Sequence, residues 1–162
     1  MHRSTATVKV VEGDLLDQHA DVIVNAWNRN IIPWWLLLPQ GVSGATKRRA
    51  GYQPFRELAR HGPIPLGGAV LTGAGRLPHQ GIIHVAGIGL WWVSSQRSIQ
   101  QSVLSAMALV QQHGFGSVAF PIIGGGTGGT RADQALQWML QSLESVDYAA
   151  AVTIVKYTAR RR

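Results

Sequence analysis

The chain of 162 residues contains no cysteine. This absence excludes a disulfide scaffold, a thiolate metal site and a cysteine nucleophile. Long apolar runs are also missing, because no stretch approaches the roughly 18 apolar residues that a membrane-spanning helix needs. The segment MHRSTATVKV at the start lacks the apolar centre of a signal peptide. We therefore expect a cytoplasmic protein that does not contact a membrane, and the residues predict neither a metal nor a cofactor.

Acidic residues are scarce, with 8 Asp and Glu against 15 Lys and Arg, which gives a formal charge of +7. The basic residues gather in two places, Lys47 to Arg49 and Arg160 to Arg162, and are otherwise scattered. A solvated face with a solubilising tail is one interpretation. Attraction of an anionic ligand or of a polyanion such as RNA is the other, and a polyanion should dissociate steeply as the salt concentration rises. We expect residues 158–162 to form a mobile basic tail.

Apolar residues make up 46% of the chain and charged residues only 14%, which is typical of a globular protein. The length suits one domain, residues 1–162. Apolar positions spaced three and four apart, among them Ile99, Val103 and Met107, predict an amphipathic helix from Ser95 to His113. Further helices are predicted at 52–61 and around 136–143. Short apolar strands are predicted at 7–11, 22–24, 67–72, 81–86, 118–120 and 151–157. The alternation predicts an α/β fold.

The stretch DVIVNAWNRNIIPWWLLLPQGVSGATKRRAG, residues 21–51, combines three signals. A buried strand ends on Asn25 and Asn28, and open α/β sheets place their ligands at the carboxyl ends of such strands. An apolar segment, Ile31 to Pro39, follows; it could fold over the domain, cover a ligand as a lid, or contact another protein. Residues 41–44 then lead into a helix, whose first N–H groups attract phosphate.

A second glycine-rich segment, GGGTGG at 124–129, follows the strand at 118–120. Glycines leave backbone N–H groups open to a pyrophosphate. The spacing also satisfies the dinucleotide fingerprint G-x-G-x-x-G, but only one strand remains after it, at 151–157, so a nicotinamide-dependent oxidoreductase is disfavoured.

Five motifs together resemble the macrodomain family, and they cover nearly the whole chain. They are GDLL at 13–16, ADVIVNAWN at 20–28, GVSGATKRRAG at 41–51, IIHVAG at 82–87 and AFPIIGGGTGG at 119–129. The resemblance implies a three-layer α/β/α macrodomain with a central mixed, mostly parallel sheet. It also implies a cleft for ADP-ribose at the strand ends, where some members only bind and others hydrolyse ADP-ribosyl derivatives.

The resemblance also implies roles for single residues. Asp14, with Leu15 beside it, would accept a hydrogen bond from the adenine amino group, although the residues alone would make Asp14 a turn or cap residue. Asn25 would shape the site, and Asn28 would face the distal ribose. The remaining expected ligand contacts are backbone positions at the pyrophosphate: Gly41, Val42, Gly44, Gly124, Gly125, Gly126, Thr127 and Gly128.

The sequence departs from the hydrolase pattern at Ser43, where the best-known hydrolases carry an Asp that positions water. A serine hydrogen-bonds water but cannot take up a proton as a carboxylate does. Lys47, one helical turn later, could compensate by stabilising negative charge, or it could simply be an exposed lysine. The catalytic candidates are therefore Asn28, Ser43 and Lys47, with the phosphate of the ligand activating water.

Three functions stay open from these residues. The first is hydrolysis of O-acetyl-ADP-ribose, ADP-ribose-1''-phosphate or a mono-ADP-ribosylated protein. The second is a non-catalytic reader of ADP-ribose or poly-ADP-ribose, and the third is an RNA-binding module. Gly128 stands where the family often has an aromatic residue, so Trp27, Trp34 or Trp35 could supply an aromatic wall for the ribose. His84, inside an apolar strand, is expected to be a hydrogen-bonded core residue.

Overall fold

The computed structural model describes residues 5–30, 41–87, 94–124 and 132–158. Its centre is a six-stranded sheet in the order β1-β6-β5-β2-β4-β3. The strands are β1 (Thr7–Gly13), β2 (Val22–Trp27), β3 (Ala69–Thr72), β4 (Gly81–Ala86), β5 (Ser117–Pro121) and β6 (Ala151–Tyr157). All neighbouring pairs are parallel except β3 and β4, which are antiparallel. The predicted mixed, mostly parallel sheet is confirmed.

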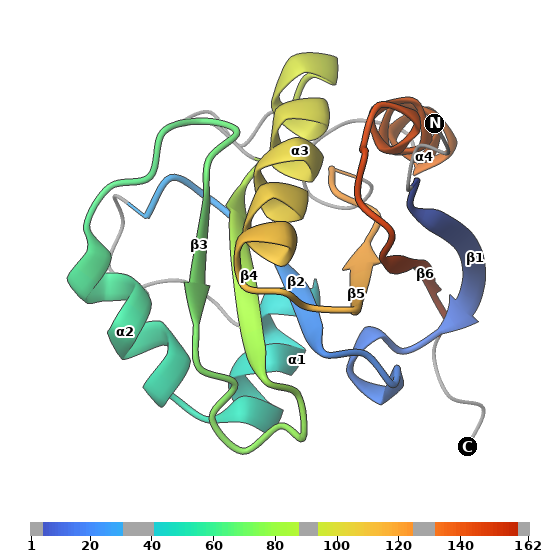
Figure 1. The fold of residues 1–162 in the computed structure, drawn as a ribbon. Coiled ribbons are helices and arrows are strands. Elements are labelled where there is room, and N and C mark those ends of the chain that lie inside the picture. Colours follow the sequence, from blue (N-terminus) through green and yellow to red (C-terminus); the bar gives the residue numbers. More distant parts are fainter. Residues whose placement is uncertain (1–4, 31–40, 88–93, 125–131, 159–162) are drawn as a thin grey trace.

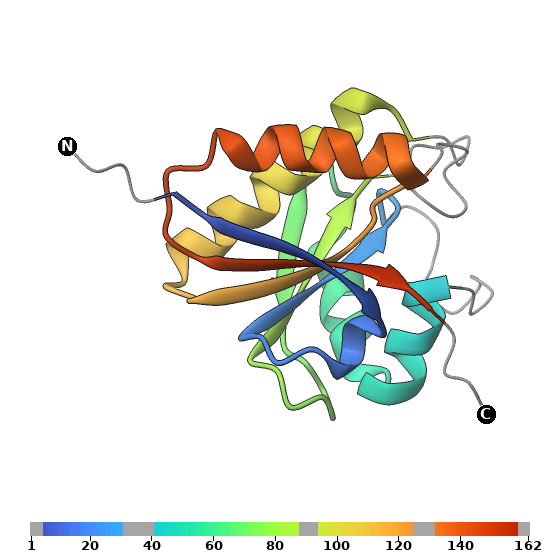
Figure 2. The ribbon, with the colours of Figure 1, turned by 90° about the vertical axis from the view of Figure 1, so that its right-hand side faces the viewer.

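Helices cover both faces of this sheet, as Figures 1 and 2 show. The short 3₁₀ helix η1 (Leu15–Asp17), α1 (Gly41–Ala50) and α2 (Gln53–His61) lie on one face. The helices α3 (Gln96–Gln112) and α4 (Ala132–Glu144) lie on the other. The three-layer α/β/α architecture is therefore confirmed. No helix in the described part of the chain is long and apolar enough to cross a membrane.

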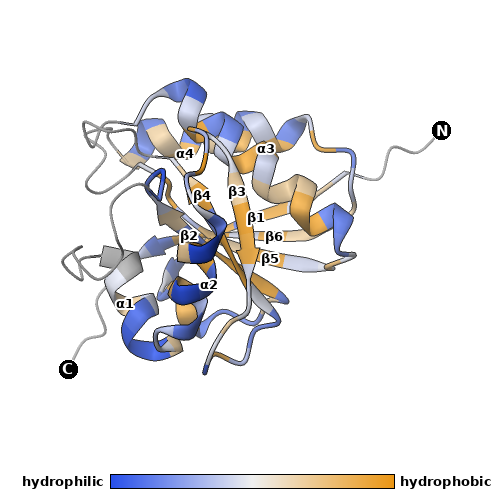
Figure 3. Ribbon diagram, turned by 90° about the vertical axis from the view of Figure 1, so that its left-hand side faces the viewer, coloured by the Kyte–Doolittle hydropathy of each residue, from blue (hydrophilic) through white to orange (hydrophobic). Residues whose placement is uncertain are grey.

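The core is divided by the sheet into clusters that follow the alternation of side chains along the strands. Val24, Ile83 and Ile154 belong to the cluster under α3 and α4. Ile23 and Ile82, their neighbours in sequence, belong to the cluster on the η1 and α1 face. Figure 3 shows apolar residues concentrated on the strands and hydrophilic residues along α1 and α2. Central strands buried on both faces explain the continuous apolar runs in the sequence.

The helix α3 has the boundaries that its sequence predicts. The hydroxyl of Ser95 accepts from the backbone N–H of Ser98 at 3.1 Å, and the hydroxyl of Ser98 accepts from the N–H of Ser95 at 2.8 Å. This reciprocal capping box fixes the first turn. At the other end Gly114 has a φ of +69°, which lets the chain leave the helix.

Candidate functional site

Five of the six strands are parallel, so their carboxyl ends share one edge of the sheet. Gly13 ends β1, Trp27 ends β2, and Tyr157 ends β6. The polar residues that the sequence singled out, Asp14 and Asn28, follow two of these ends directly. This edge is the place where open α/β sheets bind ligands, and we call it the ligand edge.

Asp14 is held by the backbone that follows it. Its Oδ1 accepts from the N–H of Leu16 at 2.9 Å and caps η1. Its Oδ2 lies 3.8 Å from Nη1 of Arg49, which donates to Oδ1 of Asp17 at 3.0 Å. The cap role that the residues alone predict is therefore confirmed, and it leaves the second oxygen for another donor. Leu15 is 4% exposed, so its side chain belongs to the core.

Tyr157 lies at the β1 end of the ligand edge, and the sequence patterns did not single it out. It is the register partner of Gly13 across β1 and β6, and it is 70% exposed. Because Val155 packs into the cluster on the η1 and α1 face, strand alternation puts Tyr157 on that same face. The position of Tyr157 could have been inferred from the sequence, because it is the last residue of the strand predicted at 151–157.

Asn25 lies inside the sheet, with no exposed surface. Its Nδ2 is 3.0 Å from Nδ1 of His84, and Nε2 of His84 is 2.9 Å from Oγ1 of Thr72. The Thr72 hydroxyl donates to the carbonyl oxygen of Gly73, so the His84 ring must carry its proton on Nε2. Burial lowers the pKa of His84 from 6.5 to about 3. His84 is the buried core histidine that the sequence predicts, and Asn25 is bound into the same network.

Asn28 lies at the surface end of β2 and is half-buried. Its Oδ1 accepts from the N–H of Asn30 at 2.7 Å, which closes a tight turn. Asn30 has a φ of +58° and donates through Nδ2 to the carbonyls of Leu58 at 2.7 Å and Gly62 at 2.9 Å. Its Oδ1 accepts from Nε1 of Trp27 at 3.3 Å. Asn30 therefore fixes the turn that carries Asn28. Its role was not predicted from the sequence, although asparagine is among the non-glycine residues that adopt this backbone conformation most often.

The helix α1 begins at Gly41, so residues 41–44 form its first turn. The prediction that these residues form a loop leading into the helix is therefore corrected. The backbone of Gly41, Val42, Ser43 and Gly44 supplies the N–H groups that a helix leaves unpaired at its start. Those groups and the positive end of the helix dipole favour an anion there.

Lys47 is mostly buried, with 7% of its surface exposed, so the alternative of an exposed lysine is wrong. Its Nζ lies 5.0 Å from the ring centre of Trp27 and 5.3 Å from that of Phe55. This geometry is a cation–π contact, which partly replaces lost hydration. Burial lowers the pKa of Lys47. Helix α1 therefore brings a cation to the end of β2, beside the Asn28 turn.

Trp27 is 3% exposed and packs 5.4 Å from Phe55, measured between ring centres. Its ring thus belongs to the core beneath Lys47. The aromatic wall predicted from Trp34 or Trp35, and the lid or protein contact predicted from Ile31 to Pro39, lie outside the described residues.

Gly124 is the one residue of the second glycine-rich segment that the structure describes. Its φ is +77°, and a Cβ atom would lie 2.5 Å from Oγ of Ser94 and 2.9 Å from Cδ1 of Ile99. Only glycine fits this place, where the chain leaves β5 against the start of α3. The predicted contacts at Gly125, Gly126, Thr127 and Gly128 lie outside the described residues. In the described ranges, no group of three His, Asp or Glu residues is arranged to hold a metal ion.

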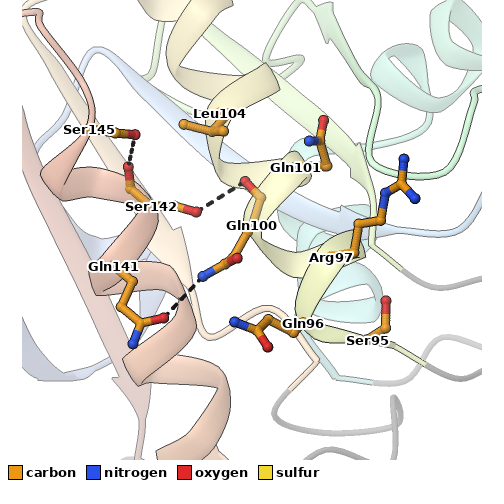
Figure 4. A pocket seen from close by; sticks show the side chains of 9 residues that line it. All are labelled: Ser95, Gln96, Arg97, Gln100, Gln101, Leu104, Gln141, Ser142 and Ser145. Carbon is orange, nitrogen blue, oxygen red and sulfur yellow. Dashed lines mark hydrogen bonds between the residues drawn. The ribbon is translucent and has the colours of Figure 1, made fainter.

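A groove of about 560 Å³ runs between α3 and α4, on the opposite face of the sheet from η1. Figure 4 shows hydrogen bonds across it: Nε2 of Gln100 donates to Oε1 of Gln141 at 3.2 Å, and the Ser142 hydroxyl donates to the backbone carbonyl of Gln100 at 3.3 Å. These contacts join the two helices. The groove is therefore a feature of helix packing, separate from the ligand edge.

Comparison with known proteins identifies the class to which this fold and edge belong. The model of the Macro domain family matches residues 24–139, which is more than half of the chain. The chain therefore belongs to the Macro domain family, as its motifs predict.

Named relatives lie within this family. The chain is 34% identical over 130 residues to an O-acetyl-ADP-ribose deacetylase of Escherichia fergusonii, a match that covers 75% of this chain and 70% of that protein. It is 35% identical over 129 residues, with the same coverage, to the O-acetyl-ADP-ribose deacetylase of Escherichia coli.

Solved structures share the fold. A macrodomain of Oceanobacillus iheyensis with ADPR superposes with a TM-score of 0.80 at 24% identity, covering 96% of this chain and 87% of that one. A Trypanosoma brucei macrodomain in complex with ADP-ribose gives a TM-score of 0.75 at 25% identity, covering 93% and 63%.

Proposed function

We propose that this protein binds ADP-ribose along the ligand edge and hydrolyses an ADP-ribosyl ester, with O-acetyl-ADP-ribose as the substrate to test first. The observation that carries the proposal is that a carboxylate and a carboxamide follow two parallel strands at the same edge of the sheet, in a member of this family. Asp14 offers an acceptor at the end of β1. Asn28 offers a carboxamide at the end of β2. Relatives named O-acetyl-ADP-ribose deacetylases support the choice of substrate.

The adenine amino group donates to Oδ2 of Asp14, and the exposed ring of Tyr157 offers a stacking surface beside it. The pyrophosphate lies against the first turn of α1 and the segment that begins at Gly124, where backbone N–H groups and a helix dipole meet negative charge. The distal ribose then reaches Asn28. Its carboxamide both donates and accepts, as hydroxyl groups require.

Hydrolysis needs a water molecule placed beside the acetyl carbonyl carbon. Asn28 and Ser43 orient this water, and a phosphate oxygen of the bound ligand takes its proton. The water oxygen bonds to the carbonyl carbon, the ester C–O bond breaks, and the phosphate returns the proton to the departing ribose oxygen, so that acetate and ADP-ribose leave. Lys47 contributes a positive charge near the developing oxyanion, held by Trp27 and Phe55.

Calorimetric titration with ADP-ribose, ADP and AMP tests the binding half of this proposal. We expect ADP-ribose to bind most tightly, because only ADP-ribose carries the distal ribose that extends from the adenine end to the β2 end of the ligand edge. If ADP-ribose does not bind, the chain shares the fold of the family but not its ligand. Selective binding without release of acetate from O-acetyl-ADP-ribose would instead make the protein a reader of ADP-ribose.

Asn28→Ala tests the catalytic half. We expect the turnover number to fall by about 10²-fold, the usual effect of removing one positioning group, while the dissociation constant of ADP-ribose changes little. Asn28→Asp is the companion variant, because it keeps the oxygen that accepts from Asn30 while it loses the amide donors and adds a negative charge. Unchanged turnover in both variants would remove Asn28 from the mechanism.

A further inference from the structure

Arg49 holds an unusual position beside the carboxylate that we assign to adenine. Its Nη1 donates to Oδ1 of Asp17 at 3.0 Å and lies 3.8 Å from Oδ2 of Asp14. The shorter contact is a charge-assisted hydrogen bond, whereas 3.8 Å is too long for one. Asp17 therefore holds the guanidinium in place, and Asp14 keeps an oxygen available for an incoming donor.

We propose that Arg49 is a specificity-determining residue that reads adenine together with Asp14. This inference rests on the proposed function. Adenine presents a donor at N6 next to an acceptor at N7, so a protein acceptor beside a protein donor recognises that edge. Oδ2 of Asp14 supplies the acceptor, and the guanidinium group of Arg49 supplies the donor. The ligand class is accordingly an adenine nucleotide bound through its N6 and N7 atoms.

Arg49 connects two elements, and this placement supports the role. The residue lies in the last turn of α1, while Asp14 and Asp17 cap and end η1. A guanidinium carries five N–H donors in a planar fork, and Asp17 takes one of them. Its side chain is 42% exposed, so a ligand can reach the remaining donors. Tyr157, on the same face, would lie against the plane of the base rather than its edge.

Three variants and one ligand analogue test the inference by calorimetry. Arg49→Ala removes the donor, Arg49→Lys keeps the charge without the fork, and Arg48→Ala removes an equal charge from the adjacent, exposed position. The analogue is 7-deaza-ADP-ribose, which lacks the N7 acceptor. The melting temperature of each variant checks that it is folded.

We expect Arg49→Ala to weaken ADP-ribose binding about tenfold, within the range for losing half of a two-point base contact. Arg49→Lys should give a smaller loss, and Arg48→Ala less than a twofold change. The wild type should bind 7-deaza-ADP-ribose about tenfold more weakly than ADP-ribose, whereas Arg49→Ala should bind the two equally.

Other results overturn the inference. If Arg49→Ala binds ADP-ribose as tightly as the wild type or more tightly, Arg49 only neutralises the two aspartates. If the wild type does not distinguish 7-deaza-ADP-ribose, or if Arg48→Ala costs as much as Arg49→Ala, the effect is one of general charge. If the wild type fails to bind ADP-ribose at all, the proposed function fails first and this inference with it.

Discussion

At the β1 end of the ligand edge, charged side chains meet solvent, whereas at the β2 end the polar groups are continuous with the core. Asp14 and Arg49 have side chains that are 27% and 42% exposed. Trp27 and Lys47 are 3% and 7% exposed. Under the proposed function, recognition at the first end depends on a few side chains that can change without disturbing the fold. At the second end, the turn that carries Asn28 is held by the same contacts that hold α2 and the core.

Trp27→Ala should have the largest effect on stability. The ring fills the space between Phe55 and Lys47, and its loss leaves a cavity together with a less shielded cation. We expect the free energy of unfolding to fall by about 3–5 kcal/mol, measured by urea denaturation. Trp27→Phe, which retains an aromatic ring, should lose less. A loss below about 1 kcal/mol for Trp27→Ala would show that the β2 end is not part of the core.

Asn30→Asp should have the second largest effect on stability. The change removes the two amide hydrogens that reach the carbonyls of Leu58 and Gly62, and it puts a carboxylate near them. We expect a loss of about 2–3 kcal/mol in the free energy of unfolding, because two partly buried acceptors lose their donor. Turnover should fall as well, since the Asn28 turn loosens. If stability fell and turnover per folded molecule did not, Asn30 would serve the fold alone.

His84 makes the interior of the sheet sensitive to acid. Burial lowers its pKa from 6.5 to about 3, so the unfolded chain binds a proton that the folded chain refuses between these values. Its contribution to stability is complete above pH 6.5 and is lost as the pH falls toward 3. The loss between pH 7 and pH 5 should be about 2 kcal/mol. His84→Gln should show a flatter dependence of urea stability on pH, and an equal slope in both proteins would contradict the assignment.

Asp14→Asn should have the smallest effect on stability. Asparagine keeps an oxygen for the N–H of Leu16, and the lost ion pair with Arg49 is loose and partly exposed. We expect the free energy of unfolding to change by less than about 0.5 kcal/mol, while ADP-ribose affinity falls. A large loss of stability would erase the contrast between the two ends.

The sequence predicts the fold well because its signals are local and mutually consistent. The apolar run at Val22 to Val24, the spacing of Ile99, Val103 and Met107, and the limits of β6 at Ala151 and Tyr157 each depend on a few neighbouring residues. The family motifs then place these elements in order. The Ser43 departure and the roles assigned to Asn28 and Lys47 stay predictions, because backbone order does not test chemistry.

The features that the sequence did not predict depend on contacts between distant segments. The burial of Lys47 requires Trp27 from β2 and Phe55 from α2. Periodicity along α1 carries no such information, and a lysine next to Arg48 and Arg49 favours an exposed basic face. The bonds from Asn30 to Leu58 and Gly62 cross 28 and 32 residues and are likewise invisible to local patterns.

The most direct test of the account is a nuclear magnetic resonance titration of the ¹⁵N-labelled protein with ADP-ribose and, separately, with AMP. With ADP-ribose, the backbone amides of Leu15 and Leu16 and those of Asn28 and Asn30 should shift together, with one dissociation constant. With AMP, only the amides near Asp14 should shift. If ADP-ribose moved the amides at only one end, or if AMP moved those at both ends, one ligand would not span the edge from Asp14 to Asn28, and the account would be contradicted.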